Sequence, residues 1–261
     1  MGNFMDLVRN ENMKIYSRMR TWIMMGILLV LMLLLSIIFA NVDEEILSMW
    51  DVFFSASTLG FMFVTIFTVV VSADSVAGEF STGTIKLLMI RPWSRSKILL
   101  SKYVSLIQFA LFFSVVLFVW LYIWEGIFFG FSAGHTNNAI SGAISGSIWS
   151  YVFKYYGLEF IGVIFTVTIS FLLSTVFRSG GLAIGLSILM MFASSILSEI
   201  LSIVDQGWVQ YLWFMQTDLL QYLNNNEHEH TLGFSLGVLG VYYIVFIAVT
   251  WILFNKRDIA T

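Results

Sequence analysis

The sequence predicts an all-α membrane protein with six transmembrane helices. Of its 261 residues, 59% are hydrophobic and only 11% are charged, and that charged fraction is roughly half of what an average soluble domain carries. The mean hydropathy is +0.88. A water-soluble protein of this length has too much surface to cover with so few charges. Because lipid offers the backbone no hydrogen-bond partners, the long apolar segments are expected to be helices.

Six apolar windows meet or approach the length of about twenty residues that a helix needs to cross the bilayer core. These windows are 22–40, 52–73, 98–124, 155–177, 181–203 and 234–254. The first window lacks a small-residue cleavage site, so we expect a retained span rather than a signal peptide. Residues 1–261 are therefore expected to form one transmembrane domain.

The basic residues determine the expected orientation. With the N-terminus in the cytoplasm, the inner segments are 1–21, 74–97, 178–180 and 255–261. If Lys102 is counted with the second of these, twelve of the thirteen Lys and Arg residues lie inside and only Lys154 lies outside. Since loops rich in Lys and Arg stay in the cytoplasm, we expect a multi-pass protein of the cell (inner or plasma) membrane with both termini cytoplasmic.

Residues 1–21 are expected to form a basic amphipathic helix. Apolar residues recur mostly three or four positions apart, at Phe4, Leu7, Val8, Ile15, Met19 and Trp22. The basic residues lie mostly elsewhere, which is typical of a helix lying along the inner membrane surface. The alternative, a positive leader that only orients the first span, stays open.

A polar stretch, residues 74–102, separates the second and third windows. It holds five of the thirteen basic residues and the only proline, Pro92. Residues 76–90 can form a short helix parallel to the membrane, which Pro92 would end, and Glu79 near its start would suit the helix dipole. The stretch is either a capped cytoplasmic linker or a docking helix that inserts into a soluble partner.

Short motifs in this stretch resemble those of the permease subunits of type-2 ABC exporters. They are Gly78 with Glu79, Gly83 with Thr84, Leu87 with Leu88, Arg91 with Pro92, Ser94 with Arg95, and Lys102. A second similarity is the basic and acidic ending at 255–258, after the last window. The six-span layout extends the resemblance over nearly the whole chain.

The resemblance implies a permease that pairs with a second copy of itself or with a similar permease, on two copies of a cytoplasmic ABC ATPase. Segment 74–97 would be the coupling segment. Its ATPase-coupling residues would be Gly78, Glu79, Gly83, Thr84, Leu88, Arg91, Pro92 and Arg95. The chain has no GxxxxGK[ST] phosphate loop, so ATP and Mg are expected on the ATPase and no cofactor on this chain.

The expected function is ATP-driven export of a hydrophobic or amphipathic compound, such as a peptide, an antibiotic or a lipid-like molecule. Segment 205–233 is expected to be an outer re-entrant or interfacial segment that closes the pathway. Glu159 and Glu199 fall inside predicted spans, where a carboxylate is costly enough to suggest a function. They either line a polar outer vestibule or are solvated and paired at the interface.

Two further patterns are weaker. GxxxG spacings at Gly181 and Gly185, and at Gly233 and Gly237, permit close helix approach. The chain has no cysteine, which excludes disulfides and thiolate metal sites. Its three histidines lie in predicted outer loops, at His135, His228 and His230, so neither a catalytic nor a metal site is expected.

Two other classes of function remain open. One is a membrane-embedded enzyme, although no candidate base lies at useful depth among the many serines. The other is a non-transporting relay that conveys the motion of an ATPase to an outer partner. Nothing in the charge pattern suggests nucleic-acid binding.

Overall fold

The computed structural model describes residues 4–41, 48–84, 93–131, 147–203, 207–223 and 230–256. Within these ranges the regular structure is helical throughout, with no strand. Several residues that the sequence singled out lie outside the described ranges, namely Leu87, Leu88, Arg91, Pro92, His135 and His228. The described ranges still contain both helices that flank the polar stretch.

The α-helices in chain order are α1 Phe4–Tyr16, α2 Met19–Ala40, α3 Met49–Ser81, α5 Arg95–Phe129, α6 Ile148–Val176, α7 Gly180–Leu201 and α8 Leu232–Lys256. Between α7 and α8 lie three short 3-10 helices, η1 Val209–Tyr211, η2 Trp213–Gln216 and η3 Leu220–Leu223. All the α-helices except α1 are long and apolar enough to cross a membrane. The expected all-α class with six candidate spans is thereby confirmed, and the chain is a multi-pass membrane protein.

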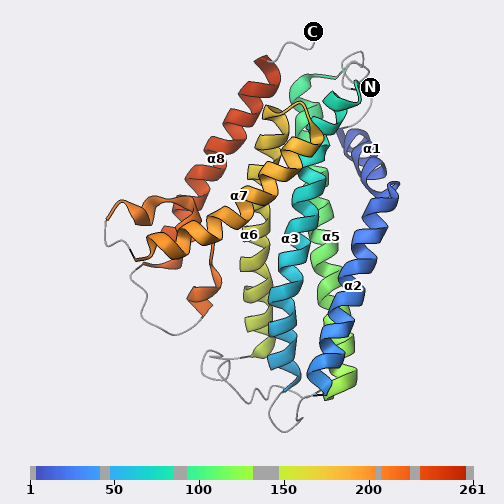
Figure 1. The fold of residues 1–261 in the computed structure, drawn as a ribbon, viewed down its shortest axis with the longest axis vertical. Helices are drawn as coiled ribbons and strands as arrows, with labels where there is room; N and C mark the ends of the chain where they lie inside the picture. Colours follow the sequence, from blue (N-terminus) through green and yellow to red (C-terminus); the bar gives the residue numbers. More distant parts are fainter. Residues whose placement is uncertain are drawn as a thin grey trace.

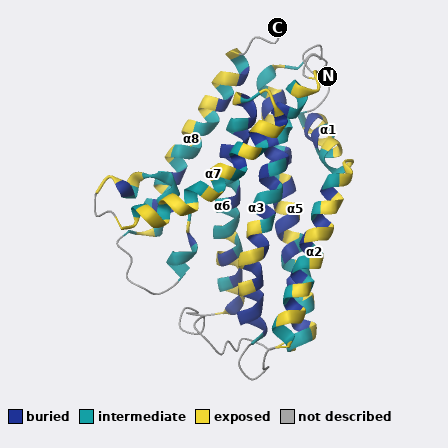
Figure 2. Ribbon diagram, viewed as in Figure 1, coloured by how far each residue is buried: buried dark blue, intermediate teal, exposed yellow. Residues whose placement is uncertain are grey.

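Helix α3 is the centre of the bundle. It packs against α2, α5, α6 and α7, and the fully buried phenylalanines include Phe53 and Phe61 on α3 and Phe109 and Phe113 on α5. Helices α2, α3, α5 and α6 run side by side, whereas α7 crosses the bundle obliquely (Figure 1). Burial is concentrated on α3, α5 and α6, whereas few residues of the outer helices α7 and α8 are buried (Figure 2). Many exposed side chains are large and apolar, as expected for surfaces that face lipid.

Two spans are longer than hydropathy alone predicts. Helix α3 has 33 residues and α5 has 35, so each is about 50 Å long, compared with a hydrocarbon core of about 30 Å. Helix α3 begins early because Ser48 and Asp51 form a capping box. It ends late because its sequence contains no proline. The chain leaves the helix only at Gly83, whose φ of 72° is positive, and a glycine in this conformation is a usual way to end a helix.

The expectation of a separate short helix starting at Val76 is therefore wrong for its first residues. Positions 76–81 are the last turns of α3, and positions 85–92 are not described. Side chains of α6 hold this part of α3. Ser174 Oγ donates to the Ala73 carbonyl at 2.6 Å and accepts from the Val76 and Ala77 amides at 3.0 Å each, and interhelical bonds of this kind stabilise membrane bundles.

Helices α3 and α7 approach closely at Gly78 and Gly180. A Cβ placed on Gly180 would lie 3.0 Å from Asp74 Oδ1 and 3.6 Å from Gly78 Cα. By contrast, a Cβ on Gly181 or Gly185 would meet nothing within 4 Å. The close packing that the GxxxG spacing suggested for these two positions is thus not made within the described chain, because both glycines face outward.

Helix α8 does not supply such a contact either. A Cβ on Gly237 would meet nothing within 4 Å, and one on Gly233 would meet only Thr231 Oγ1, at 3.8 Å. None of these four GxxxG glycines therefore brings two spans together within the described chain, whereas Gly180, one residue before the first of them, does.

We predict that Gly180→Ala lowers the stability of the purified protein by about 1–3 kcal/mol, as overpacking usually does. The crowded atom, Asp74 Oδ1, cannot simply swing away because Arg18 and Arg20 hold the other oxygen of that carboxylate. Thermal unfolding in detergent measures the effect. The control is Gly181→Ala, which should be neutral or stabilising by up to about 1 kcal/mol because alanine favours a helix. Equal unfolding temperatures for the two variants would contradict the close contact.

Candidate functional site

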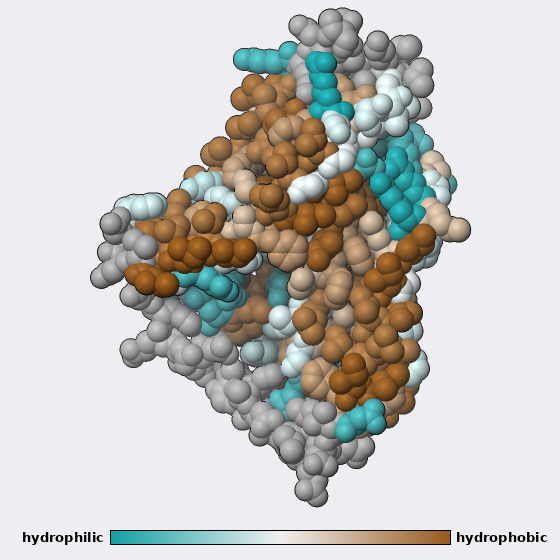
Figure 3. Space-filling model, viewed as in Figure 1, coloured by the Kyte–Doolittle hydropathy of each residue, from teal (hydrophilic) through white to brown (hydrophobic). Residues whose placement is uncertain are grey.

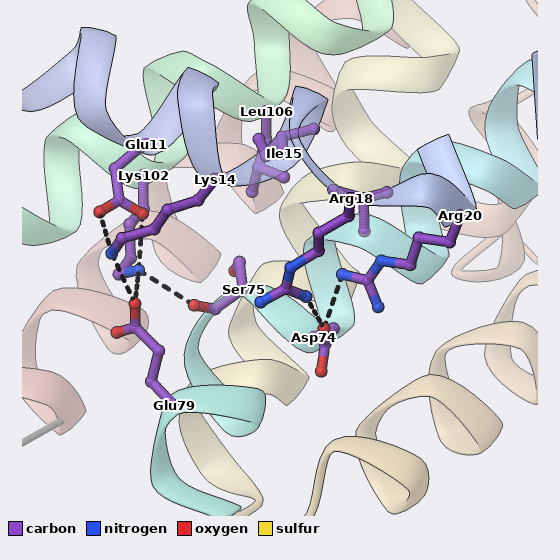
Figure 4. Close-up of a pocket in the computed structure, with 11 residues that line it drawn as sticks. Glu11, Lys14, Ile15, Arg18, Arg20, Asp74, Ser75, Glu79, Lys102 and Leu106 are labelled. Atoms are coloured by element: carbon purple, nitrogen blue, oxygen red, sulfur yellow. Dashed lines mark hydrogen bonds and ion pairs between the residues drawn. The ribbon is translucent and has the colours of Figure 1, made fainter. Parts of the chain in front are cut away.

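A charged junction joins α1, α3 and α5 where the polar stretch leaves the bundle (Figure 4). It consists of Glu11 and Lys14 on α1, Glu79 on α3 and Lys102 on α5. The Lys102 side chain is only 2% exposed, and its Nζ lies 2.8 Å from Glu11 Oε2 and 2.7 Å from Glu79 Oε1. The same Nζ donates to the Ser75 carbonyl at 3.1 Å. Three acceptors therefore match the three donors of the ammonium group.

Lys14 closes the junction from its more exposed side. Its Nζ lies 2.6 Å from Glu11 Oε1 and 3.0 Å from Glu79 Oε1. Each carboxylate thus contacts both ammonium groups, and the two positive and two negative charges cancel. Buried charges are tolerated when they are paired and hydrogen-bonded in this way, and loss of one member would leave its partners uncompensated.

A second ionic contact lies beside the junction and ties the start of α2 to α3. Arg18 Nη1 lies 2.7 Å and Arg20 Nη2 lies 2.6 Å from the same oxygen of Asp74, Oδ2. Arg18 lies in the turn between α1 and α2 and Arg20 in the first turn of α2, so this arginine clamp holds the turn. The pocket that the clamp shares with the junction is lined by charged side chains from α1, α2, α3 and α5.

The junction keeps its α1 members charged. Burial by itself would raise the pKa of Glu11, but the ammonium groups of Lys102 and Lys14 outweigh burial and hold that pKa below its ordinary value. Burial would lower the pKa of Lys14, but the carboxylates of Glu79 and Glu11 outweigh it and raise that pKa. Both ion pairs therefore persist at neutral pH.

The structure places Glu79 differently from the expectation. It was expected near the start of a docking helix, but it lies in the last turn of α3, because that helix continues without a break. Its side chain is 12% exposed and both of its ionic contacts are within the chain. One oxygen, Oε2, is buried and has no hydrogen-bond partner.

The remaining coupling candidates that the structure describes lie at the two edges of the polar stretch. Gly83 ends α3, and the Thr84 hydroxyl shares a 2.9 Å hydrogen bond with the Thr82 hydroxyl. Arg95 begins α5 and donates from Nη1 to the carbonyl of Asn255 at 3.1 Å. Arg95 thus caps the end of α8, where a cation suits the free carbonyls, and brings α8 to the same end of the bundle as α1.

Glu159 and Glu199 do not belong to this site. Glu159 lies on α6 and is half-buried. Glu199 is exposed in the last turns of α7. Among the described residues no hydrogen bond or ion pair joins these two glutamates, and no group of three residues could hold a metal ion.

Two buried charged residues were missed from the sequence. Lys102 was assigned to the membrane edge, but the structure buries it between helices, and a lysine in an apolar span is itself a signal that carboxylate partners lie nearby. Glu125 lies just beyond the predicted window 98–124, at the opposite end of α5 from the junction; it is fully buried and accepts a 2.6 Å hydrogen bond from Ser36 Oγ on α2.

We predict that Glu11→Gln lowers the stability of the folded protein at neutral pH and that the difference in stability from the wild type shrinks in acid. The folded pKa of Glu11 lies below its ordinary value of 4.5, so its stabilising contribution is complete above that value and is lost as the pH falls through the folded pKa. Unfolding temperatures of both proteins between about pH 7 and pH 3 measure the gap. A gap that stays constant or widens in acid would contradict the ion pair, and Glu199→Gln controls for loss of an exposed carboxylate.

Comparison with known proteins connects the chain to a family. The family described as "Protein of unknown function (DUF2705)" matches residues 22–260. The uncharacterized protein YhcI of Bacillus subtilis (strain 168) is 32% identical over 202 residues, which cover 75% of this chain and 64% of YhcI. The uncharacterized membrane protein YdbK of the same organism is 25% identical over 195 residues, covering 74% of this chain and 76% of YdbK. The family match spans all six candidate spans together with Asp74, Glu79 and Lys102, and the chain therefore belongs to the DUF2705 family.

Proposed function

We propose that this protein is the membrane-spanning permease subunit of an ATP-driven exporter of the type-2 ABC class. It would move a hydrophobic or amphipathic compound out of the cell, with ATP and Mg bound by a separate ATPase. The observation that carries the proposal is the charged junction. It clamps the two longest spans together where each of them meets the polar stretch.

The charged junction would make α3 and α5 move together. Lys102 on α5 and Glu79 on α3 are joined at 2.7 Å, so a push on the segment between Ser81 and Arg95 would move both helices as one body. Because α3 also packs against α6 and α7, such a movement would change the contacts between the two sides of the bundle. Rigid-body tilting of packed helices is a common way to convert a local push into a larger rearrangement.

Helices α3 and α5 are long enough to extend beyond the membrane. Each is about 50 Å long, some 20 Å more than the hydrocarbon core. The excess includes the polar residues at the end of α3 and the start of α5. In our proposal this end is cytoplasmic, with α1 along the inner membrane surface, and two permease copies rest on two ATPase copies.

The edges of the polar stretch would contact the ATPase. Gly83 and Thr84 are exposed at the end of α3, and Leu88, Arg91 and Pro92 would continue the contact beyond the described residues. Glu79 and Arg95 would act indirectly, because their side chains already bind partners within the chain. Glu159 would line the outer part of the pathway, and Glu199 would lie at its rim.

We predict that the protein purified from its native membrane in mild detergent carries an ATPase in near equal amount. Thr84→Glu should reduce that ATPase at least about tenfold, the loss expected when a charge is buried unpaired at an interface. Thr84 is preferred to Glu79 as the test position because it is exposed and lies outside the ionic network.

The matched control is Asn41→Glu, an exposed position at the end of α2, on the opposite side of the bundle from the polar stretch. It should retain the ATPase. Mass spectrometry of the purified material gives the ratio, and thermal unfolding confirms that both variants fold. A wild-type protein that carries no ATPase, or a Thr84→Glu variant that retains it fully, would overturn the proposal.

A further inference from the structure

A cavity lies between α6, α7 and η2, apart from the charged junction. Five hydroxyl groups line it, those of Thr166, Ser187, Ser194, Ser195 and Thr217. The other lining residues are apolar, namely Ile169, Met190, Met191 and Trp213. None of the lining residues is ionisable. In the space-filling view the surface is hollowed beside α6 and below the oblique helix α7 (Figure 3).

Helix α7 presents an unusual face to this cavity. Ser187, Met190, Met191, Ser194 and Ser195 recur at spacings of three and four, so they share one side of the helix. Aliphatic and aromatic residues such as Leu182, Leu189 and Phe192 are exposed on its other sides. Large apolar side chains are thus exposed on the other sides of the helix, and hydroxyl groups, among them the buried Ser187, gather on the side that lines the cavity.

Ser187 provides an independent indication that the cavity accepts a ligand. Its side chain is 3% exposed, and its Oγ has no hydrogen-bond partner. A serine within a helix usually donates back to a carbonyl of the preceding turn, as Ser194 does to Met191 at 2.7 Å. Buried hydroxyl groups are rarely left without a partner, so this one lacks an acceptor that a ligand in the cavity could supply.

Two other hydroxyl groups of the lining can accept hydrogen bonds from a ligand. Thr166 Oγ1 donates to the Gly162 carbonyl at 3.0 Å, and Thr217 Oγ1 donates to the Phe214 carbonyl at 3.0 Å. Their protons are used within the chain, but their oxygens can still accept. The cavity thus offers a buried free donor at Ser187 and acceptor oxygens on Thr166 and Thr217, without a charge of either sign.

We propose that this hydroxyl cavity binds the head of an uncharged amphiphile that enters from the bilayer, of the diacylglycerol type. An ester carbonyl would accept from Ser187, and the free glycerol hydroxyl would donate to a threonine or serine oxygen. The acyl chains would lie against Met190 and Met191, whose flexible thioethers adapt to irregular apolar shapes. A lipid with a phosphate would find no cation here to offset the loss of its hydration.

This inference goes beyond the proposed export function, because it does not require an ATPase. None of the lining residues belongs to the charged junction or to the polar stretch. Loss of binding in the experiment below would leave the ATPase co-purification unchanged, so failures of the two proposals can be told apart.

The test uses the full chain in detergent with a diacylglycerol that carries a photoactivatable group in one acyl chain. Labelled peptides are mapped by mass spectrometry. We expect labelling of the α7 peptide that contains Met190 and Met191, and Ser187→Ala should reduce it about fivefold, the loss of one ligand hydrogen bond. This variant removes only an unpartnered hydroxyl, so it should unfold at the same temperature as the wild type or higher.

Two controls make the result decisive. Ser198→Ala, about three turns further along α7 than Ser187, removes a hydroxyl that donates to the Ser195 carbonyl and does not line the cavity; it should retain full labelling. Unlabelled diacylglycerol should compete, whereas phosphatidic acid with the same chains should not. Labelling spread evenly over the lipid-facing helices, labelling unchanged by Ser187→Ala, or equal competition by phosphatidic acid would overturn the proposal.

Discussion

The buried ammonium group of Lys102 is the interaction on which the arrangement of this end of the bundle depends. Removing a charge from water is costly unless partners replace the water, and here the replacements come from two other helices, Glu11 on α1 and Glu79 and Ser75 on α3. The short helix α1 is therefore an integral part of the bundle. If it left the bundle, Lys102 would lose one of its two carboxylates and Glu11 would be released into a different environment.

The same constraint explains how one end of a membrane bundle can be polar and still rigid. The Lys102 contacts fix α1, α3 and α5, the arginine clamp on Asp74 fixes the turn into α2, and Arg95 fixes the end of α8. Asp74 also sits where Gly78 and Gly180 let α3 and α7 cross. Among the described helices, α1, α2, α3, α5 and α8 thus have a polar tie at this end, α7 meets α3 by close packing at Gly180, and α6 is joined to α3 through Ser170 and Ser174.

Hydropathy was enough to predict the class and the six spans, because the lipid requirement acts on every residue of a span. It could not predict where the helices end, since those limits depend on local caps such as Ser48 and on Gly83. Glu79 and Lys102 were both singled out, but the pairing of Lys102 with Glu11 was not predicted, because that contact joins residues 91 positions apart. The role of Ser187 was equally invisible, since a serine in an apolar helix is usually satisfied by its own backbone.

A double-mutant cycle between Glu79 and Lys102 tests the central claim most directly. Unfolding of the wild type, Glu79→Gln, Lys102→Met and the double variant is measured in the same detergent. The account predicts that each single change destabilises the protein, because it leaves the buried network with an uncompensated net charge, and that the double variant is more stable than the sum of the two losses by about 0.5–3 kcal/mol. Strictly additive losses would show that the two residues act independently, and the charged junction could then not be what holds α3 and α5 together.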